Sequence, residues 1–246
     1  MKLLKSAKFI GALVLAAAVT FSGGMVTNGF AASVDPAQEE WRKVEEAKEK
    51  ETQEYLRQAD NRIDEAAVKK SAADKGIQLK SVPAEGGIAV PSEGVTAAKK
   101  DPRVGDPGDV LVTLDAKTSG WNHGHAGIVV SRKKSNKFTV EAFPEKGVGY
   151  HANDWKSRYK TVKGLHVKGA KAKHYNGAQK WAQAQVGKPY SLTAGKNQTS
   201  KYYCSLLVWK AWRLQGWDID HDGGYYVFPI DILKDAHTVA FYSKGF

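Results

Sequence analysis

The sequence predicts an α+β fold in which an antiparallel sheet packs against one cysteine-bearing helix. Short β-like runs occur at 109–114, 121–131 and 138–143, each bounded by polar residues or glycine. The stretch 201–216 has the pattern of an amphipathic helix and contains Cys204, the single cysteine of the chain. A helix flanked in sequence by short antiparallel strands is typical of the α+β class.

The helix around Cys204 places the thiol where a nucleophile is favoured. Its apolar residues recur at helical spacing: Leu207, Val208, Ala211 and Leu214. Gly216 stands where such a helix ends, and Ser200 or Thr199 is the expected N-terminal cap. Cys204 then falls in the first turn, where the helix dipole lowers the pKa of a thiol below its usual ~8.5. The alternative is a small buried apolar residue without chemistry.

The first 32 residues have the pattern of a secretory signal peptide. Lys2, Lys5 and Lys8 form a basic region, and the apolar run 9–19 follows. Small residues at 31–33 offer a cleavage point. The run is shorter than the roughly 20 residues that a membrane span requires. We therefore expect an exported protein, secreted or associated with the cell envelope.

The net charge and the single cysteine limit the kinds of binding partner that we expect. The net charge of +11 falls to +8 when the three lysines of the signal region are removed. That basicity suits anionic envelope polymers or membrane surfaces. Because the lysines are spread out and no nucleic-acid-binding motif is found, we expect no nucleic-acid partner. One cysteine cannot form an internal disulfide, so the thiol of an exported chain is either used or well buried.

Two further segments precede the main domain, which is expected over 104–246. Residues 33–79 are charged and favour helix, with Asp35 as a cap and Pro36 in the first turn. An apolar stripe runs along this segment but fails at 48–53, which argues against a coiled coil. We expect a solvated helix or helical pair, or a partner-binding spacer. Residues 80–103, rich in Pro, Gly, Ala and Ser, read as a linker.

The rest of the main domain is predicted to alternate between strands and a helix. Residues 132–137 form a polar turn between the second and third β-like runs. Further on, we expect a strand over 161–167, a helix over 178–186, and a last strand over 236–243.

A catalytic cysteine needs a base and a group that orients the base. His125 begins a strand among small residues, where Gly124 and Gly127 leave room for a helix end or a substrate. His123 shares this setting, and period-2 alternation places it on the same face. Glu141 is a lone carboxylate in an apolar strand. A turn centred near Lys133 places Glu141 opposite His125, whereas a turn at 135–136 breaks the pair.

An ordered set of motifs resembles the permuted NlpC-type papain-fold hydrolases of the YiiX- and YycO-like group. The resemblance covers about 104–246 and excludes the helical segment. Its motifs begin at Gly108 (GDVLV), Gly124 (GHAGI), Val140 (VEA), Gly187 (GKPY), Tyr203 (YCSLLVW) and Phe228 (FPID). In ordinary NlpC-type peptidases the cysteine helix precedes the histidine strand. Here the histidine comes first, which marks the permuted group.

The resemblance implies a role for four residues. Cys204 matches the nucleophile, His125 the base, and Glu141 the polar residue that holds the imidazole. Tyr190 is similar to the tyrosine whose hydroxyl lines the site near the oxyanion, although a core or substrate-stacking tyrosine has the same pattern. The chain reads Tyr203-Cys-Ser-Leu where ordinary peptidases read Asp-Cys-Ser-Gly, so their subsites do not transfer.

The remaining motifs do not make a metal site. Residues 218–223 begin like a calcium-binding loop, but Pro229 stands where the loop requires glutamate. His123 and His125 are metal-ligand types without a third ligand at a suggestive spacing. We expect neither a metal nor another cofactor.

The sequence thus predicts a secreted cysteine hydrolase that cleaves amide bonds through Cys204, His125 and Glu141. The resemblance implies cell-wall peptides or other small amides as substrates. Two alternatives stay open. A lipid acyltransferase or esterase uses the same three residues, and lecithin:retinol-type acyltransferases are relatives of the permuted fold. A binding module that kept the fold and lost turnover is the other.

Overall fold

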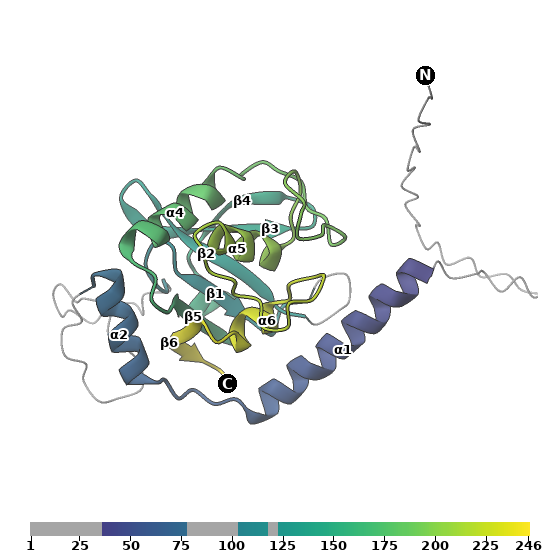
Figure 1. Ribbon diagram of the computed structural model, residues 1–246, viewed down its shortest axis with the longest axis horizontal. Helices are drawn as coiled ribbons and strands as arrows, with labels where there is room; N and C mark the ends of the chain where they lie inside the picture. Colours follow the sequence, from purple (N-terminus) through teal and green to yellow (C-terminus); the bar gives the residue numbers. More distant parts are fainter. Residues whose placement is uncertain (1–35, 78–102, 118–122) are drawn as a thin grey trace, which may run out of the picture.

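The structure is a computed structural model that describes residues 36–77, 103–117 and 123–246 (Figure 1). The predicted signal peptide at 1–32 lies outside the described residues. The predicted linker at 80–103 also lies outside them, apart from its last residue, as does the predicted helix cap Asp35.

The core element is a six-stranded sheet in the order β4-β3-β2-β1-β5-β6, with every neighbouring pair antiparallel. The strands are β1 (Val110–Thr113), β2 (His125–Arg132), β3 (Ser135–Phe143), β4 (Gly147–Ala152), β5 (Val162–Val167) and β6 (Thr238–Lys244). Together with the helices, this sheet confirms the predicted α+β class. Strand β4 was not predicted, because its two glycines and its histidine mask the alternation that marks a half-buried strand.

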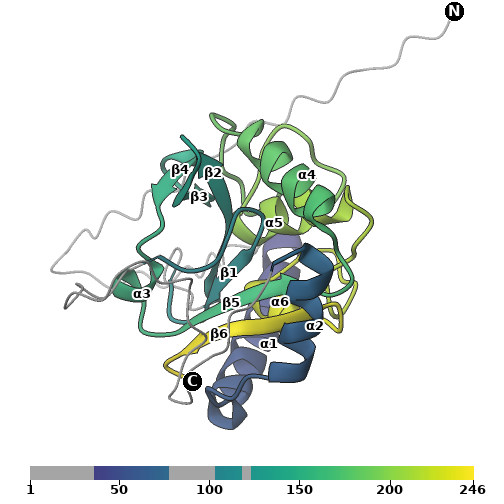
Figure 2. The same ribbon diagram turned by 90° about the vertical axis from the view of Figure 1, so that its left-hand side faces the viewer.

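Two helices cover one face of the sheet (Figure 2). They are α4 (Ala172–Gln183) and α5 (Cys204–Arg213), and both contact β2. The short helix α6 (Pro229–Lys234) packs beside β1 and β6. Leu206, Leu207 and Trp212 of α5 are fully buried in the main core, so packing fixes the helix that carries the cysteine.

Two helix boundaries differ from the prediction. Helix α5 is capped by Tyr203 and not by Ser200 or Thr199. The reason is local hydrogen bonding, since the Ser200 hydroxyl donates to Gln198 and the Thr199 carbonyl accepts from Tyr202. Cys204 nevertheless lies in the first turn. Helix α4 begins six residues earlier than expected, where polar residues obscure the helical period.

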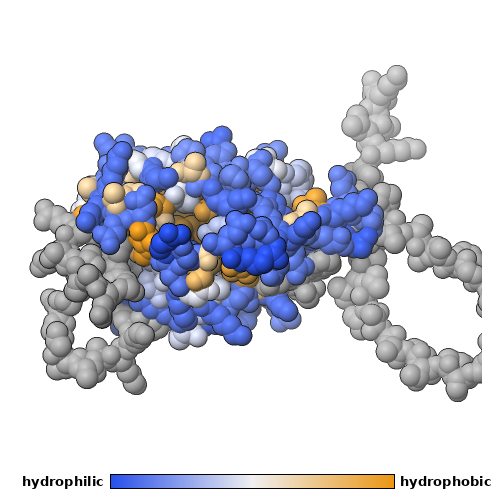
Figure 3. Space-filling view, turned by 90° about the horizontal axis from the view of Figure 1, so that it is seen from below, coloured by the Kyte–Doolittle hydropathy of each residue, from blue (hydrophilic) through white to orange (hydrophobic). Residues whose placement is uncertain are grey.

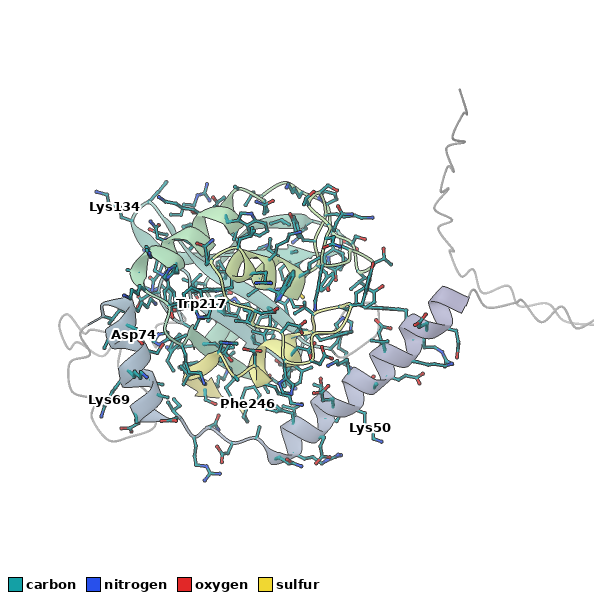
Figure 4. All side chains as sticks on the ribbon, viewed as in Figure 1. Lys50, Lys69, Asp74, Lys134, Trp217 and Phe246 are labelled. Carbon is teal, nitrogen blue, oxygen red and sulfur yellow. The ribbon has the colours of Figure 1, made fainter. Side chains whose placement is uncertain are left out.

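The predicted helical segment contains α1 (Pro36–Gln58) and α2 (Glu65–Lys75). Both lie outside the sheet, and α1 projects beyond it (Figure 1). Lys50 of α1 and Lys69 of α2 point away from the domain (Figure 4). Seen from below, the surface is mostly hydrophilic, with apolar side chains in small patches (Figure 3). Among the described residues, no helix has both the length and the apolar character needed to cross a membrane.

Each of these helices inserts a lysine into the domain. The Lys48 ammonium of α1 lies 2.5 Å from Asp231 and 2.7 Å from Asp222. The Lys75 ammonium of α2 lies 2.6 Å from Asp109. Lys48 lies within residues 48–53, where the apolar stripe is interrupted. At this position the buried face of α1 is formed by a lysine paired with carboxylates, and hydrophobic periodicity does not detect such a residue. Helix α1 is therefore docked on the domain and is not fully solvated.

Candidate active site

The β2–β3 hairpin brings His125 and Glu141 to one face of the sheet. Its turn residues Lys133 and Lys134 both have positive φ (54° and 57°), which fits the right-handed twist of a hairpin. Ile128 pairs with Val140, so Glu141 stands on the same face as His125. The turn therefore lies at 133–134, close to the Lys133 alternative, and the turn at 135–136 is wrong. The register sets Glu141 opposite Gly127, so the carboxylate is a diagonal neighbour of His125 and not its direct cross-strand partner.

The two side chains meet directly. The Nε2 atom of His125 lies 2.8 Å from Oε2 of Glu141, and the Glu141 side chain is completely buried. Gly127 makes this contact possible, because a Cβ atom there would lie 2.9 Å from Cγ of Glu141 and 2.9 Å from the Trp155 ring. The glycine was expected to make room for a helix end or a substrate. It makes room for the carboxylate instead.

The second oxygen of Glu141 accepts three further hydrogen bonds. Nη2 of Arg158 donates at 2.7 Å and Nε1 of Trp155 at 3.0 Å, and the Thr139 hydroxyl donates as well. Trp155 and Arg158 come from the short helix α3 (Trp155–Arg158), which no periodic pattern in the sequence predicts. Sequence reasoning missed all three donors, although an indole and a guanidinium closely following a strand with a buried carboxylate are a usable signal.

These partners decide the charge of Glu141. Burial alone would raise its pKa, but the hydrogen bond and charge of His125 and the charge of Arg158 lower the pKa to about 2. The carboxylate is therefore ionised throughout the physiological range. Because Arg158 balances that charge, His125 is held by a nearly neutral pair.

Cys204 is the first residue of α5, and its side chain is almost completely buried. Its thiol interacts with the His125 imidazole and accepts a hydrogen bond from the backbone N–H of Ala126. Burial opposes ionisation of the thiol, but the charge and hydrogen bond of His125 outweigh it and lower the pKa. The start of the helix favours the thiolate in the same direction.

The pKa of His125 is shifted in the opposite direction. Burial alone would lower its pKa, but the charges and hydrogen bonds of Cys204 and Glu141 raise the pKa to about 9. With Nε2 turned to Glu141, Nδ1 is the ring nitrogen available to the thiol. Both shifts favour the pair of a thiolate and an imidazolium, which is the reactive form of a cysteine–histidine couple.

A small cavity of about 20 Å³ opens beside Cys204. Tyr190, the predicted auxiliary residue, lines it and forms an isolated bridge with Tyr202. Trp41 of α1 also lines the cavity, although nothing in the sequence linked that helix to the cysteine. The remaining lining residues are His123, Leu192, Tyr203, Ser205, Tyr226, Val227, Phe228 and Pro229.

His123, the rival base, has a different environment. Its ring packs edge-on against Phe228, with centroids 6.4 Å apart, and it lines the cavity. Its Nδ1 atom has no hydrogen-bond partner among the described residues, and burial lowers its pKa. His125 alone of the two holds a carboxylate, so the geometry selects His125 as the base.

The residues of the calcium-like motif contribute to an acidic cluster. Carboxylate oxygens of Asp220, Asp222 and Asp231 lie within 4.8 Å of one another. Lys48 forms ion pairs with Asp222 and Asp231, and Lys196 pairs with Asp220. Ammonium groups thus balance the charge that a bound cation would neutralise.

Comparison with known proteins agrees with this geometry. Residues 111–220 match the model of a family described as "Permuted papain-like amidase enzyme, YaeF/YiiX, C92 family". This segment is thus similar to permuted papain-like amidases. The match includes His125, Glu141, Tyr190 and Cys204, and it confirms the resemblance seen in the sequence motifs.

The chain is also similar to one curated protein whose name indicates no substrate. The chain is 32% identical over 139 residues to the protein named "Uncharacterized protein YycO" of Bacillus subtilis (strain 168). The aligned part covers 53% of this chain and 53% of that protein. The chain therefore spans about half the length of the curated relative it matches. No solved structure matches the chain.

Proposed function

We propose that the protein is a cysteine amidase in which Cys204, His125 and Glu141 act together. The observation that carries the proposal is the chain of contacts from a helix-start thiol to an imidazole and on to a buried carboxylate 2.8 Å away. Each contact favours the charged form of its neighbour. The arrangement therefore holds a thiolate nucleophile and a protonated base ready in the same site.

In the first half-reaction the Cys204 thiolate attacks the carbonyl carbon of the amide. A carbon–sulfur bond forms, and the carbonyl electron pair moves onto the oxygen. The backbone N–H of Cys204 has no intrahelical acceptor and is placed to bind that oxygen, with Tyr190 as a second contact. His125 then gives its proton to the departing amine as the carbon–nitrogen bond breaks, which leaves a thioester.

Water completes the reaction. His125, now neutral, takes a proton from the attacking water, and the oxygen adds to the thioester carbon. The carbon–sulfur bond breaks, the thiolate returns, and a carboxylic acid leaves. Glu141 stays ionised throughout and fixes the ring so that Nδ1 faces the sulfur. Arg158, Trp155 and Thr139 hold the carboxylate in turn.

We infer that the substrates are small amides of the cell envelope, such as cell-wall peptides, and that the protein is exported to reach them. Support for export comes from the basic and apolar pattern of residues 1–32. The net positive charge supports contact with anionic envelope polymers or a membrane surface.

The first test is the rate of iodoacetamide alkylation across a wide pH range. Because Cys204 is the single cysteine, alkylation reports on this thiol alone. We expect a rate that is already high well below pH ~8.5 in the wild-type protein and falls strongly in His125→Ala. His237→Ala is the matched control, since His237 also contacts a carboxylate, Asp235, but on the surface.

An ordinary thiol profile that ignores His125 would overturn the proposal and favour a binding module. A panel of peptide amides and acyl esters separates the amidase from the alternatives. Release of amine from amides supports the proposal. Transfer or hydrolysis confined to lipid esters would replace it with the acyltransferase or esterase reading of the same residues.

A further inference from the structure

The cavity at Cys204 is built mostly from aromatic side chains. Its lining includes the rings of Trp41, Tyr226 and Phe228, here called the aromatic wall, together with Tyr203 and Tyr190. The Trp41 ring stands edge-on to Tyr226 with centroids 4.4 Å apart. It lies nearly parallel to Phe228, at 18° and 6.0 Å. Trp41, Tyr226 and Phe228 all fall outside residues 111–220, so this wall belongs to this chain and not to the matched family segment.

The cavity is too small to receive an acyl group as it stands. Its volume of about 20 Å³ is close to the space of one water molecule. Cys204 is 6% exposed, so a substrate reaches the sulfur only when part of the wall moves. The sheet and α5 are buried core elements and are poor candidates for that movement.

Helix α1 is the part of the wall that is attached from outside. It contributes no strand to the sheet, and side chains hold it: Trp41 on the rings and Lys48 on Asp231 and Asp222. Trp41 itself is only partly buried. An indole that slides on neighbouring rings opens the cavity without disturbing the thiol, the imidazole or the carboxylate.

Among the described residues of the lining, one buried side-chain nitrogen has no hydrogen-bond partner. The Tyr203 hydroxyl accepts from the Val227 N–H, and the Ser205 hydroxyl donates to the Val227 carbonyl. Nδ1 of His123 has no partner, although the residue is only 7% exposed. A buried ring nitrogen without a partner is costly unless a ligand supplies one.

We propose that this cavity is the acyl-group subsite of the enzyme, where a flat, uncharged group of the substrate stacks on Trp41 and Phe228 and hydrogen-bonds to His123. The inference rests on the proposed amidase function and names its substrate class: amides whose acyl side carries an aromatic or similarly planar neutral group. Aromatic walls bind planar groups well. The same walls exclude a charge, because nothing in the lining would pair with it.

Two thiol reagents test the subsite without a known substrate. Phenacyl bromide carries a flat aromatic ring and a carbonyl acceptor, whereas iodoacetamide has no ring. We measure the ratio of their alkylation rates at Cys204, normalised to free cysteine. Wild-type protein should prefer phenacyl bromide and should show saturation with it. The carboxylated analogue 4-(bromoacetyl)benzoic acid should lose that preference.

Variants of the lining residues identify which side chains cause the preference for phenacyl bromide. Trp41→Ala should lower the normalised ratio about 3- to 10-fold, the size of an aromatic contact, and Trp41→Phe should restore most of it. His123→Phe keeps a ring and removes the nitrogen, and it should lower the ratio about 5-fold. Tyr55→Ala is the matched control, because Tyr55 anchors the same helix on Phe246 and does not line the cavity.

The outcomes separate the two proposals. The subsite proposal is overturned if Trp41→Ala leaves the ratio unchanged or accelerates both reagents equally. In that case α1 only limits access to the cavity. If Cys204 still shows His125-dependent reactivity well below pH ~8.5 in that case, the amidase proposal stands alone. A thiol with an ordinary pH profile that does not depend on His125 overturns both proposals. Far-ultraviolet circular dichroism of each variant verifies that it is folded.

Discussion

Two buried carboxylates, Glu141 and Asp231, hold very different positions in this molecule. Both side chains are completely buried and both face a cation. The partners of Glu141 all come from β2, β3 and α3, within one part of the domain. Asp231 accepts from the backbone of Phe228 and pairs with Lys48, which α1 brings from far away in the sequence.

The difference shows in how readily each group takes up a proton. Burial is offset at Glu141 by His125 and Arg158, and the pKa falls to about 2. At Asp231 burial prevails over Lys48, aided by the negative charge of Asp222, and the pKa rises to about 6. The carboxylate beside His125 is thus fixed in its charged state, whereas the carboxylate that Lys48 of α1 contacts titrates near physiological pH.

Glu141→Gln should have the largest effect. His125 loses an anion that raises its pKa, so less thiolate exists at pH 6, and alkylation there should slow about 10- to 100-fold. Arg158 loses its buried charge partner and keeps only the exposed carboxylate of Asp154, which costs about 3 kcal/mol in the free energy of unfolding. Alkylation kinetics and urea denaturation measure the two effects. The exposed neighbour change Glu145→Gln should alter neither, and equal behaviour of the two variants would contradict the network.

Gly127→Ala should come next. The added Cβ meets Cγ of Glu141 and the Trp155 ring at 2.9 Å, so the carboxylate must shift away from His125. We expect amide hydrolysis and alkylation at pH 6 to fall about 10-fold, with a stability loss of about 1–3 kcal/mol. Gly149 pairs with Glu141 from β4, and its added Cβ has only an ordinary contact at 3.5 Å. Gly149→Ala is therefore the control, and a similar loss in both variants would refute the steric argument.

The docking of α1 should strengthen in acid. Burial raises the pKa of Asp231 from 3.8 to about 6, so its contribution to the free energy of unfolding is present below pH 3.8 and lost as pH rises through 6, although its ion pair with Lys48 acts in the opposite direction. Glu45 of α1 follows the same sign, because burial raises its pKa from 4.5 to about 7. The pKa values of Glu51 and Asp222 are lowered, so their contributions change only in stronger acid.

Hydrogen exchange of the α1 amides, corrected for intrinsic rates, measures this docking. Protection should be several-fold greater at pH 5.5 than at pH 8, while the sheet should show little change. Glu45→Gln should remove part of the difference. The exposed adjacent change Glu46→Gln should not, and greater protection of α1 at pH 8 would reverse the assignment.

Asp231→Asn should have the smallest effect. The amide still accepts from the Phe228 N–H, and Lys48 keeps Asp222 and Glu51 as partners. We expect a loss of about 1 kcal/mol, confined to α1 and measured as faster limited proteolysis of that helix. The pH profile of Cys204 alkylation should not move. A shifted profile would show that the two carboxylates are coupled.

Local patterns were enough to predict the catalytic elements. Residues 201–216 carry a helical period with a cysteine at the front, and the strands of His125 and Glu141 have β-like composition. The sequence left the hairpin register open, because both the Lys133 turn and the 135–136 turn satisfy the polarity pattern. The register is set by the left-handed backbone conformation of Lys133 and Lys134. Asparagine or glycine at these positions would have predicted that conformation, whereas lysine does not.

The rest of the site depends on contacts between distant segments. Trp155 and Arg158 reach Glu141 because β4 turns the chain back, and β4 lacks the alternation that predicts a strand. Trp41 reaches the cavity because Lys48 pairs with Asp231, a match of charges that no local period reveals. The domain boundaries, the export signal and the catalytic roles remain predictions to be tested.

The order of these residues along the chain has a consequence for synthesis. Trp41 is made first, then the imidazole of His125 and the carboxylate of Glu141, and Cys204 comes only after β5 and α4. The base and the carboxylate are therefore synthesised before the thiol, whereas Tyr226 and Phe228 of the cavity follow it. A chain that ends before residue 204 thus has no thiol, and every chain that acquires the nucleophile already carries His125 and Glu141.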